Sequence, residues 1–395
     1  MTIKHGGNLL QIIAQYGGEE SEWVDLSTGV SPFTYPVGNI PESVWNRLPQ
    51  PNDGLERAAK TYYQAAQEPV AIAGSQAGIM ILPAIVRQLR AGNAGVIALP
   101  KVGYKEHQHA WLKHSTECHA GSQSDWQVIW YDDFPSVEQV KQSDVVLVIN
   151  PNNPSGYTAT STELLHLHQQ LIDNGGMLIV DEAFVDTQPD NSILTKLDKL
   201  EHIVVFRSVG KFFGLAGARV GFLFADQEIR QQVYQRIGPW TVTGPSRWIM
   251  RQALTDVAWQ VDTSKKISQA SERLQQLLTD YLVAPLNKLN GTVPLSRSLL
   301  PPSRVVKEAA VKGTVPLNTS SKVSLKGTDL FCTVSIEEAV FLHDWLCQHA
   351  IFTRLCDEQD GVRFGLPANE SQWKKLEAAL VEFSQLVSRT SALAV

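Results

Sequence analysis

Hydrophobic runs of strand length recur through the middle of the chain. Residues 145–149, 176–180 and 203–206 are rich in β-branched and aromatic side chains, which is typical of buried strands. Between residues 156 and 175 the apolar positions recur at helical spacing. A strand, a helix and a second strand in this order predict a unit with parallel strands. We therefore expect an α/β protein with a mostly parallel central sheet flanked by helices.

Polar residues follow each of these three strands. Asn150-Pro151-Asn152-Asn153-Pro154-Ser155-Gly156 follows the first, Asp181 follows the second, and Ser208 and Lys211 follow the third, with Arg219 further on. Open α/β sheets bind ligands at the carboxyl ends of their strands. This set of residues suits pyridoxal phosphate (PLP). The lysine can react with its aldehyde, the acid can pair with its pyridine nitrogen, and the serine and the arginine can bind its phosphate. We place Lys211 on the loop after its strand.

Each of these residues has a chemical reason to meet PLP. The Lys211 amine can condense with the aldehyde and, once the substrate amine displaces it, act as general acid and base at Cα. The Asp181 carboxylate can keep the pyridine nitrogen protonated. Asn153 can donate to the phenolic oxygen, and Ser208 and Arg219 can hold the phosphate.

A second candidate phosphate site lies earlier in the chain. Gly74-Ser75-Gln76-Ala77 precedes an apolar run with helical character at 79–82, so its backbone amides would open a helix. For Ser75 and Gln76 an ordinary helix cap is an equally good interpretation. The run 210–214 lacks the residues of a nucleotide phosphate loop, which excludes a nucleotidase.

These motifs resemble those of fold-type I PLP enzymes in the class I/II aminotransferase superfamily, over nearly the whole chain. The shared motifs are Asn-Pro-Asn-Asn-Pro-Ser-Gly at 150–156, Asp181-Glu182-Ala183, and Ser208 to Gly221 with Lys211 and Arg219. Finer features resemble the threonine-phosphate decarboxylase branch of cobalamin biosynthesis. They are His5-Gly6-Gly7-Asn8, Arg47-Leu48-Pro49, Gly54-Leu55, Gly74-Ser75-Gln76-Ala77, Val102-Gly103-Tyr104-Lys105-Glu106-His107, Pro239-Trp240-Thr241-Val242, Gly327-Thr328-Asp329-Leu330-Phe331 and Arg363-Phe364-Gly365-Leu366-Pro367.

The resemblance implies further residues and a domain organisation. The resemblance implies that Arg363 contacts the substrate α-carboxylate, Arg354 a distal anion and His5 the substrate phosphate. Taken singly, each arginine is more often part of a surface ion pair, and His5 could equally belong to a disordered terminus. Alternating strands and helices place the PLP-binding domain at 49–252. The resemblance joins 1–48 with 253–395 in a smaller α+β domain and predicts a homodimer. We expect residues 284–326, before a strand at 327–331, to form a loop insertion, with 301–322 as its surface part.

Three positions depart from the usual transaminase pattern. Phe184 replaces a tyrosine that donates to the cofactor's phenolic oxygen, and Leu48 replaces a tyrosine that reaches the neighbouring subunit's phosphate. Val102 falls at the position of the ring-stacking aromatic, so Tyr104 or His107 would have to cover the ring. The departures at Phe184 and Leu48 fit the decarboxylase branch.

The implied reaction is decarboxylation of L-threonine O-3-phosphate to (R)-1-amino-2-propanol O-2-phosphate. Two alternatives stay open: an aminotransferase of the histidinol-phosphate type, and a non-catalytic relative that binds PLP. Whichever bond at Cα lies perpendicular to the conjugated plane decides between decarboxylation and transamination. Retention of Lys211, Asp181 and Arg363 argues against the non-catalytic relative.

Composition limits the remaining functions. The 395 residues are 43% hydrophobic and 19% charged, enough for a large core, and a net charge of −6 gives no footprint for nucleic acid or an anionic membrane. No run approaches the roughly 20 apolar residues of a spanning helix, and the start lacks a signal-peptide pattern, so we expect a cytoplasmic protein. Four cysteines without CxxC spacing predict neither a disulfide framework nor a metal site.

Overall fold

The structure is a computed structural model that describes residues 3, 5–116, 126–288, 292–296, 314–318 and 322–393. The chain forms two compact units, of which the larger comprises residues 34–264 and the smaller residues 1–33 and 265–395. Residues 34–48 and 253–264 pack within the larger unit, where the rings of Tyr35 and Trp259 lie 5.1 Å apart. Compact units are a different division from evolutionary domains, so the domain limits expected from the sequence stay a prediction.

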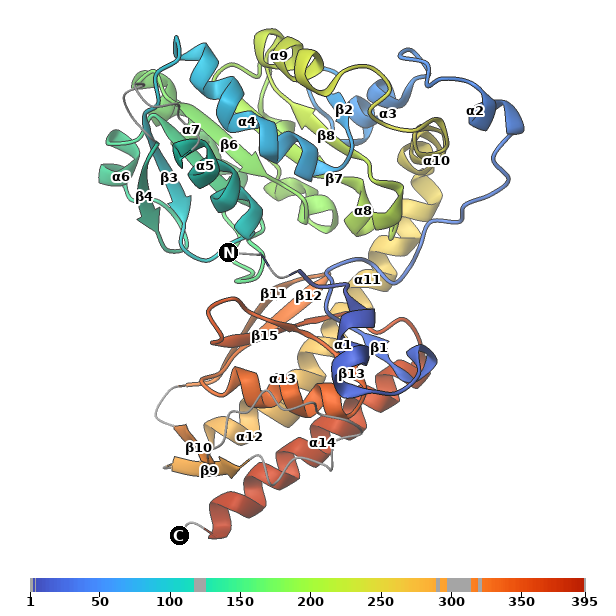
Figure 1. The fold of residues 1–395 in the computed structure, drawn as a ribbon, viewed down its shortest axis with the longest axis vertical. Helices are drawn as coiled ribbons and strands as arrows, with labels where there is room; N and C mark the ends of the chain where they lie inside the picture. The colour runs from blue at the N-terminus through green and yellow to red at the C-terminus, as the bar shows by residue number, and fades with distance from the viewer. Residues whose placement is uncertain are drawn as a thin grey trace. The chain divides into compact units, whose positions relative to one another are not determined.

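The larger unit is built on a seven-stranded sheet (Figure 1). In spatial order its strands are β2 (Val70–Ile72), β8 (Gly221–Phe224), β7 (Ile203–Ser208), β6 (Met177–Asp181), β5 (Val145–Ile149), β3 (Val96–Pro100) and β4 (Gln127–Tyr131). Strand β8 runs opposite to the other strands of this sheet, so its pairings with β2 and β7 are antiparallel and the remaining pairings are parallel. The expectation of a mostly parallel sheet is therefore confirmed.

Helices cover the sheet on both sides, and their ends follow from local sequence signals. They include α3 (Leu55–Tyr62), α4 (Ser75–Leu89), α5 (Lys105–Thr116), α6 (Val137–Lys141), α7 (Ser161–Asp173), α8 (Val209–Phe212), α9 (Gln227–Ile237) and α10 (Gly244–Thr255). Helix α7, the predicted helix between 156 and 175, starts where the Thr160 side chain accepts from the Glu163 amide in a capping box. It ends just before Gly175, which has φ 68°.

One apolar core holds this sheet and its helices together. Helices α4 and α5 lie side by side over the sheet (Figure 1). Ile79, Ile85 and Val86 of α4 and Trp111 of α5 are buried against strand residues such as Phe206. Each such side chain contributes about 1.5–3 kcal/mol by leaving water, so this core fixes the strand ends that carry the polar motifs.

The smaller unit is an α+β arrangement. Its antiparallel sheet has the order β11 (Ser324–Thr328), β12 (Phe331–Ser335), β15 (Gly361–Gly365) and β14 (Arg354–Leu355). A parallel pair joins β1 (Val24–Asp25) to β13 (Ile351–Phe352). The unit also contains α1 (Leu9–Tyr16), α12 (Ala284–Asn287), α13 (Ala339–Gln348) and α14 (Glu370–Leu393). Helix α11 (Val257–Leu278) begins in the larger unit and ends in the smaller one.

Two segments differ from the sequence expectations. The single strand expected at 327–331 is instead the end of β11, a turn at Asp329 and Leu330, and the start of β12. The segment 284–326 contains α12 and the start of β11, together with a hairpin of β9 (Thr292–Ser296) and β10 (Thr314–Asn318). Residues 297–313 and 319–321, which include most of the expected surface insertion, lie outside the described residues.

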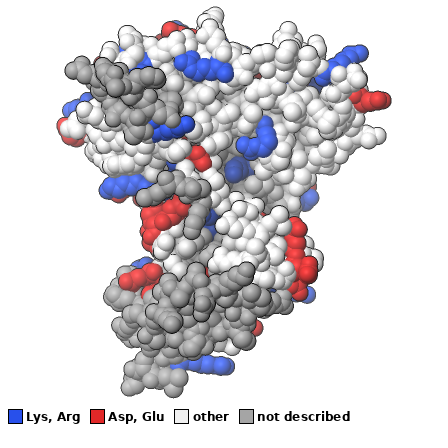
Figure 2. Space-filling model, viewed as in Figure 1, with Lys and Arg blue, Asp and Glu red and all other residues white. Residues whose placement is uncertain are grey.

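Neither charged side chains nor cysteines form a metal site or a disulfide among the described residues. On the face drawn in Figure 2, the Lys and Arg side chains of the larger unit are scattered, and some of them lie beside Asp or Glu side chains. Cys332, Cys347 and Cys356 are buried free thiols, and Cys118 lies outside the described residues. Within the part of the chain that is described, no three His, Cys, Asp or Glu side chains gather as metal ligands. No helix there combines the length and apolar character that a membrane span requires.

Candidate active site

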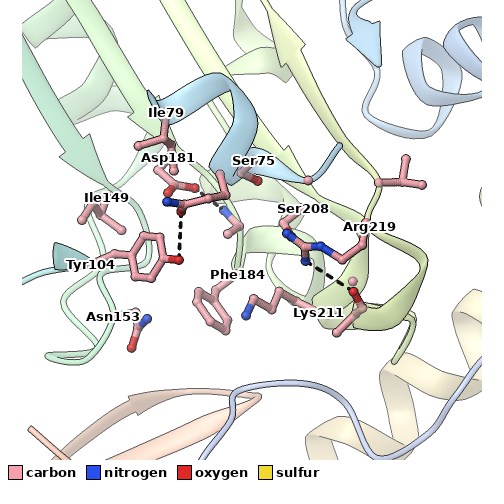
Figure 3. A pocket seen from close by; sticks show the side chains of 16 residues that line it. Ser75, Ile79, Tyr104, Ile149, Asn153, Asp181, Phe184, Ser208, Lys211 and Arg219 are labelled. Carbon is pink, nitrogen blue, oxygen red and sulfur yellow. Dashed lines mark hydrogen bonds between the residues drawn. The ribbon is translucent and has the colours of Figure 1, made fainter. Parts of the chain in front are cut away.

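A pocket lies at the carboxyl edge of the parallel strands in the larger unit (Figure 3). Its walls come from the ends of β5, β6 and β7, from the start of α4, and from the segments that precede α5 and β8. Most residues predicted to bind PLP line it: Ser75, Gln76, Tyr104, Asn153, Asp181, Ser208, Lys211 and Arg219. Ala77, the third residue of α4, is not among the lining residues, and its amide donates to Gly74 O at 3.1 Å.

Asp181 is buried at the end of β6 and is held by two partners. His107 Nε2 lies 2.8 Å from Asp181 Oδ2, and the Ala183 amide donates to Oδ1 at 3.1 Å. The His107 ring is itself buried on α5, in edge contact with Phe206 and Tyr104. This pairing fixes the carboxylate in the pocket wall.

Lys211 and Phe184 face each other in the pocket (Figure 3). Lys211 Nζ lies 5.1 Å from the centroid of the Phe184 ring, close enough for a cation–π contact. Lys211 belongs to the one-turn helix α8, so the expected loop position is corrected: β7 extends to Ser208 and the chain turns directly into a helix. The buried apolar side chains of Val209 and Phe212 anchor that turn.

The start of α4 forms a cradle with Arg219. Gly74 has φ 76°, and a Cβ at this residue would lie 2.7 Å from Arg219 Nη2. A Cβ on Gly221 would lie 2.7 Å from the Ser75 amide nitrogen, so both glycines are needed for the close approach. Arg219 Nη1 donates to Ala216 O at 3.4 Å (Figure 3).

Ser75 Oγ has a property that tests whether an anion fits this cradle. It is buried and has no hydrogen-bond partner among the described residues. A buried hydroxyl without a partner is costly unless a ligand supplies one. The donor set of the Ser75 hydroxyl, the first amides of α4 and the Arg219 guanidinium is the chemistry that binds a phosphate. The residues present therefore fit the phosphate of PLP.

Tyr104 lines the pocket and Val102 does not. The position expected for the ring-stacking residue thus carries an aliphatic side chain outside the wall, whose carbonyl accepts from Asn152 Nδ2 at 2.8 Å. The Tyr104 hydroxyl donates to Gln76 Oε1 at 3.1 Å. Burial, followed by the charges of Glu106 and Asp181, raises the pKa of Tyr104 to about 12.

A network of buried charges lies beside Asp181 and Ser208 in the chain. Arg207 Nη1 donates to Glu182 Oε2 at 2.8 Å, and Nη2 donates to Asp186 Oδ1 at 3.3 Å. Glu182 also accepts from Ser192 Oγ at 2.6 Å and from the Ile193 amide at 2.8 Å. Burial raises the pKa of both Glu182 and Asp186, against the lowering effect of Arg207. The network joins the ends of β6 and β7.

The three predicted substrate residues belong to the smaller unit. His5 is exposed; Arg354 pairs with Asp357 at 2.8 Å; and buried Arg363 donates to Ser27 O. Burial and the neighbouring Arg354 charge lower the pKa of Arg363 to about 10. A nearby anion would stabilise its charged form. Their roles toward substrate stay predictions.

Sequence reasoning missed two polar residues of this region. His107 was considered only as a possible ring cover, and its partner Asp181 lies 74 residues away in the sequence. Glu106 accepts from Gln76 Nε2 at 2.7 Å, a partner 30 residues away. The one available signal was local. Tyr104 directly precedes α5, and Glu106 and His107 lie in its first turn, which places three polar groups at one end of the helix.

Comparison with known proteins gives a family and a fold. The family model described as aminotransferase class I and II matches residues 45–299. The chain is 35% identical to a threonine-phosphate decarboxylase from Pseudomonas aeruginosa, over 97% of this chain and 98% of that protein.

Two solved structures share the fold at 17% identity each. A histidinol-phosphate aminotransferase from Sinorhizobium meliloti, in complex with pyridoxal-5'-phosphate, matches with a TM-score of 0.69 and covers 97% of this chain and 98% of its own. An L-threonine-O-3-phosphate decarboxylase from Porphyromonas gingivalis matches with a TM-score of 0.64 over 91% and 99%. The resemblance seen in the motifs is thereby confirmed, and the chain belongs to the aminotransferase class I and II family.

Proposed function

We propose that this protein is a PLP-dependent decarboxylase that converts L-threonine O-3-phosphate to (R)-1-amino-2-propanol O-2-phosphate. The observation that carries the choice of reaction is the similarity to a threonine-phosphate decarboxylase along almost the entire chain. The pocket geometry supports the cofactor, because a lysine, a buried acid and a phosphate cradle line one cavity.

The proposal assigns the cofactor to the residues of this pocket. Ser75, Ser208, Arg219 and the first amides of α4 would hold the phosphate, and Asn153 the phenolic oxygen. Bound PLP supplies an electron sink that takes up the electron pair left when a bond at Cα breaks. Phe184 contributes a ring surface but no hydroxyl, so the donor that many transaminases have at this position is missing.

Two side chains would govern the protons. Asp181, oriented by His107, would keep a proton on the ring nitrogen, where a positive charge favours electron withdrawal. Lys211 would return a proton to Cα after carbon dioxide leaves, from a position over the Phe184 ring. The carboxyl bond breaks with its electrons kept by the substrate, so one proton and one carbon dioxide balance the reaction.

Anion recognition would select the substrate. We propose Arg363 for the α-carboxylate, with Arg354 and His5 for the phosphate. Arg363 is buried and lies near the positive charge of Arg354, so a substrate anion bound there would offset both charges. Exchanging the substrate phosphate for a hydroxyl should therefore weaken binding strongly.

The proposal also includes the homodimer and the cytoplasmic location expected from the sequence. Large apolar side chains of the larger unit, Trp45, Leu48 and Trp240, are 65%, 60% and 56% exposed in the single chain. Exposed apolar residues of this size are typical of interaction surfaces. Light scattering coupled to gel filtration tests the dimer, and a monomer at micromolar concentration would contradict it.

A product assay tests the reaction. The PLP-loaded protein is incubated with L-threonine O-3-phosphate, and carbon dioxide and the amino alcohol phosphate are measured. L-Threonine without phosphate serves as the control substrate and should react far more slowly. Formation of glutamate from 2-oxoglutarate and histidinol phosphate, without carbon dioxide from threonine phosphate, would refute the proposal in favour of the aminotransferase.

A further inference from the structure

A chain of hydrogen bonds leads from the pocket wall to a residue outside it. The Tyr104 hydroxyl lies 3.1 Å from Gln76 Oε1, and Gln76 Nε2 lies 2.7 Å from Glu106 Oε2. Tyr104 and Gln76 line the pocket, whereas Glu106 is not one of its lining residues. The chain connects the first turn of α4 to the start of α5.

The chemistry of the three groups fixes the direction of both hydrogen bonds. An ionised carboxylate only accepts, so Gln76 must turn its NH₂ toward Glu106. The amide oxygen of Gln76 then faces Tyr104 and accepts the proton of the tyrosine hydroxyl. A hydroxyl has one proton, so the Tyr104 proton is committed to Gln76 and its oxygen can only accept from other groups.

The surroundings keep that proton in place. Burial is the main cause that raises the pKa of Tyr104 to about 12, followed by the negative charges of Glu106 and Asp181 and opposed by Arg219. Tyr104 is consequently protonated at neutral pH and can donate throughout the working range. The ring is also held from its other side by the edge contact with His107, 6.2 Å between centroids.

We infer that Glu106 is a positioning residue, which acts through Gln76 to fix the Tyr104 ring in the pocket and to keep its hydroxyl proton away from the ligand. The inference rests on the proposed PLP site. With Phe184 lacking a hydroxyl and Tyr104 giving its proton to Gln76, neither aromatic side chain donates to the cofactor's phenolic oxygen. That role would fall to Asn153, which also lines the pocket.

The substitution Glu106→Gln tests this because it removes the acceptor-only end of the chain. An amide at 106 can donate or accept, so Gln76 can rotate and the Tyr104 proton is released. We expect the affinity of the apoprotein for PLP, measured by fluorescence titration, to weaken by about 3- to 10-fold, in line with the loss of a charge-assisted hydrogen bond. We also expect a shift in the visible absorbance maximum of the bound cofactor.

Glu138→Gln is the matched control. Glu138 also accepts from a glutamine amide, Gln142 Nε2 at 2.7 Å, but on the exposed surface of α6. It should leave both readouts unchanged. Glu106→Asp, which keeps an acceptor-only group, should change them less than Glu106→Gln, and thermal unfolding of each apoprotein reports whether it is folded.

A double-mutant cycle with Tyr104→Phe separates action through Tyr104 from a direct charge effect. If Glu106 acts through the tyrosine, Glu106→Gln has no further effect on affinity or absorbance in the Tyr104→Phe background. Equal effects in both backgrounds, or unchanged affinity and absorbance in folded Glu106→Gln, would overturn the inference while leaving the proposed function intact. A wild-type protein that does not bind PLP would contradict the proposed function, and the inference with it.

Discussion

Two pairs of polar residues at the ends of β6 and β7 differ in their surroundings. Asp181 and Ser208 line the pocket, whereas their chain neighbours Glu182 and Arg207 form a buried ion pair at 2.8 Å. Successive side chains on a strand point to opposite faces. The same two strand ends therefore face the pocket on one side and the buried scaffold on the other.

The difference between the two pairs lies in what surrounds them. Glu182 and Arg207 are 0% and 3% exposed, and their partners come from the protein itself. Asp181 is almost as buried, yet its wall opens on a cavity that also contains Lys211. Burial alone therefore does not distinguish Asp181, the acid that we propose for the cofactor, from Glu182, whereas the adjoining cavity does.

The largest expected effect is on the scaffold side. Arg207→Met leaves two carboxylates buried without their cation, so we expect a loss of about 3–5 kcal/mol in the free energy of unfolding, measured by urea denaturation. Arg273→Met is the control, because Arg273 pairs with Glu370 on the surface and its loss should cost about 0–1 kcal/mol. Equal losses for the two variants would show that the buried ion pair stabilises the fold no more than the surface ion pair does.

On the pocket side we expect a loss of rate instead. Asp181→Asn removes the charge that would stabilise a protonated ring nitrogen, and kcat should fall by about 10²–10³-fold, the range for removing one preorganised electrostatic group. Carbon dioxide release per bound PLP is the measurement. A variant that keeps its kcat and loses only stability would show that Asp181 serves the scaffold, as Glu182 does, and not the reaction.

His107 should have a smaller effect on the same step. His107→Phe removes the ring nitrogen that lies 2.8 Å from Asp181 Oδ2, and loss of one buried hydrogen bond to a charge costs about 1–3 kcal/mol. We expect a reduction in kcat of roughly tenfold, without change in the KM for threonine phosphate. A change confined to KM would assign His107 to substrate binding.

Ser75 gives the smallest and sharpest test. Its hydroxyl is buried without a partner, so Ser75→Ala should leave the unfolding free energy of the apoprotein nearly unchanged. Its affinity for PLP should fall by about 1 kcal/mol, the value of one hydrogen bond, in a fluorescence titration. Unchanged affinity would remove Ser75 from the phosphate cradle.

Local patterns were sufficient to predict the sheet and much of the pocket. Each of the three buried strands is a continuous apolar run with a polar residue at its end, and parallel pairing brings those ends together. The predicted wall of Asp181, Asn153 and Lys211 needs no more than that geometry. Strand ends were less predictable, since Ser208 and its neighbours extend β7 through pairing with β8.

What the sequence could not predict depends on partners distant in the chain. The pairing of His107 with Asp181 and of Gln76 with Glu106 requires α4, α5 and β6 to be assembled first. The sequence around residues 329–330 has the pattern of an apolar strand, because the turn itself contains Leu330, a buried apolar residue. Periodicity reports burial, and it cannot report where the backbone reverses.

The central claim is that Lys211 carries the cofactor, and chemical trapping tests it most directly. The PLP-loaded protein is reduced with borohydride, digested and mapped by mass spectrometry. The account predicts one pyridoxyl group per chain, on the peptide that contains Lys211, and none at this site in Lys211→Ala. A reduced protein whose Lys211 is unmodified, or whose label sits on another lysine, would contradict it.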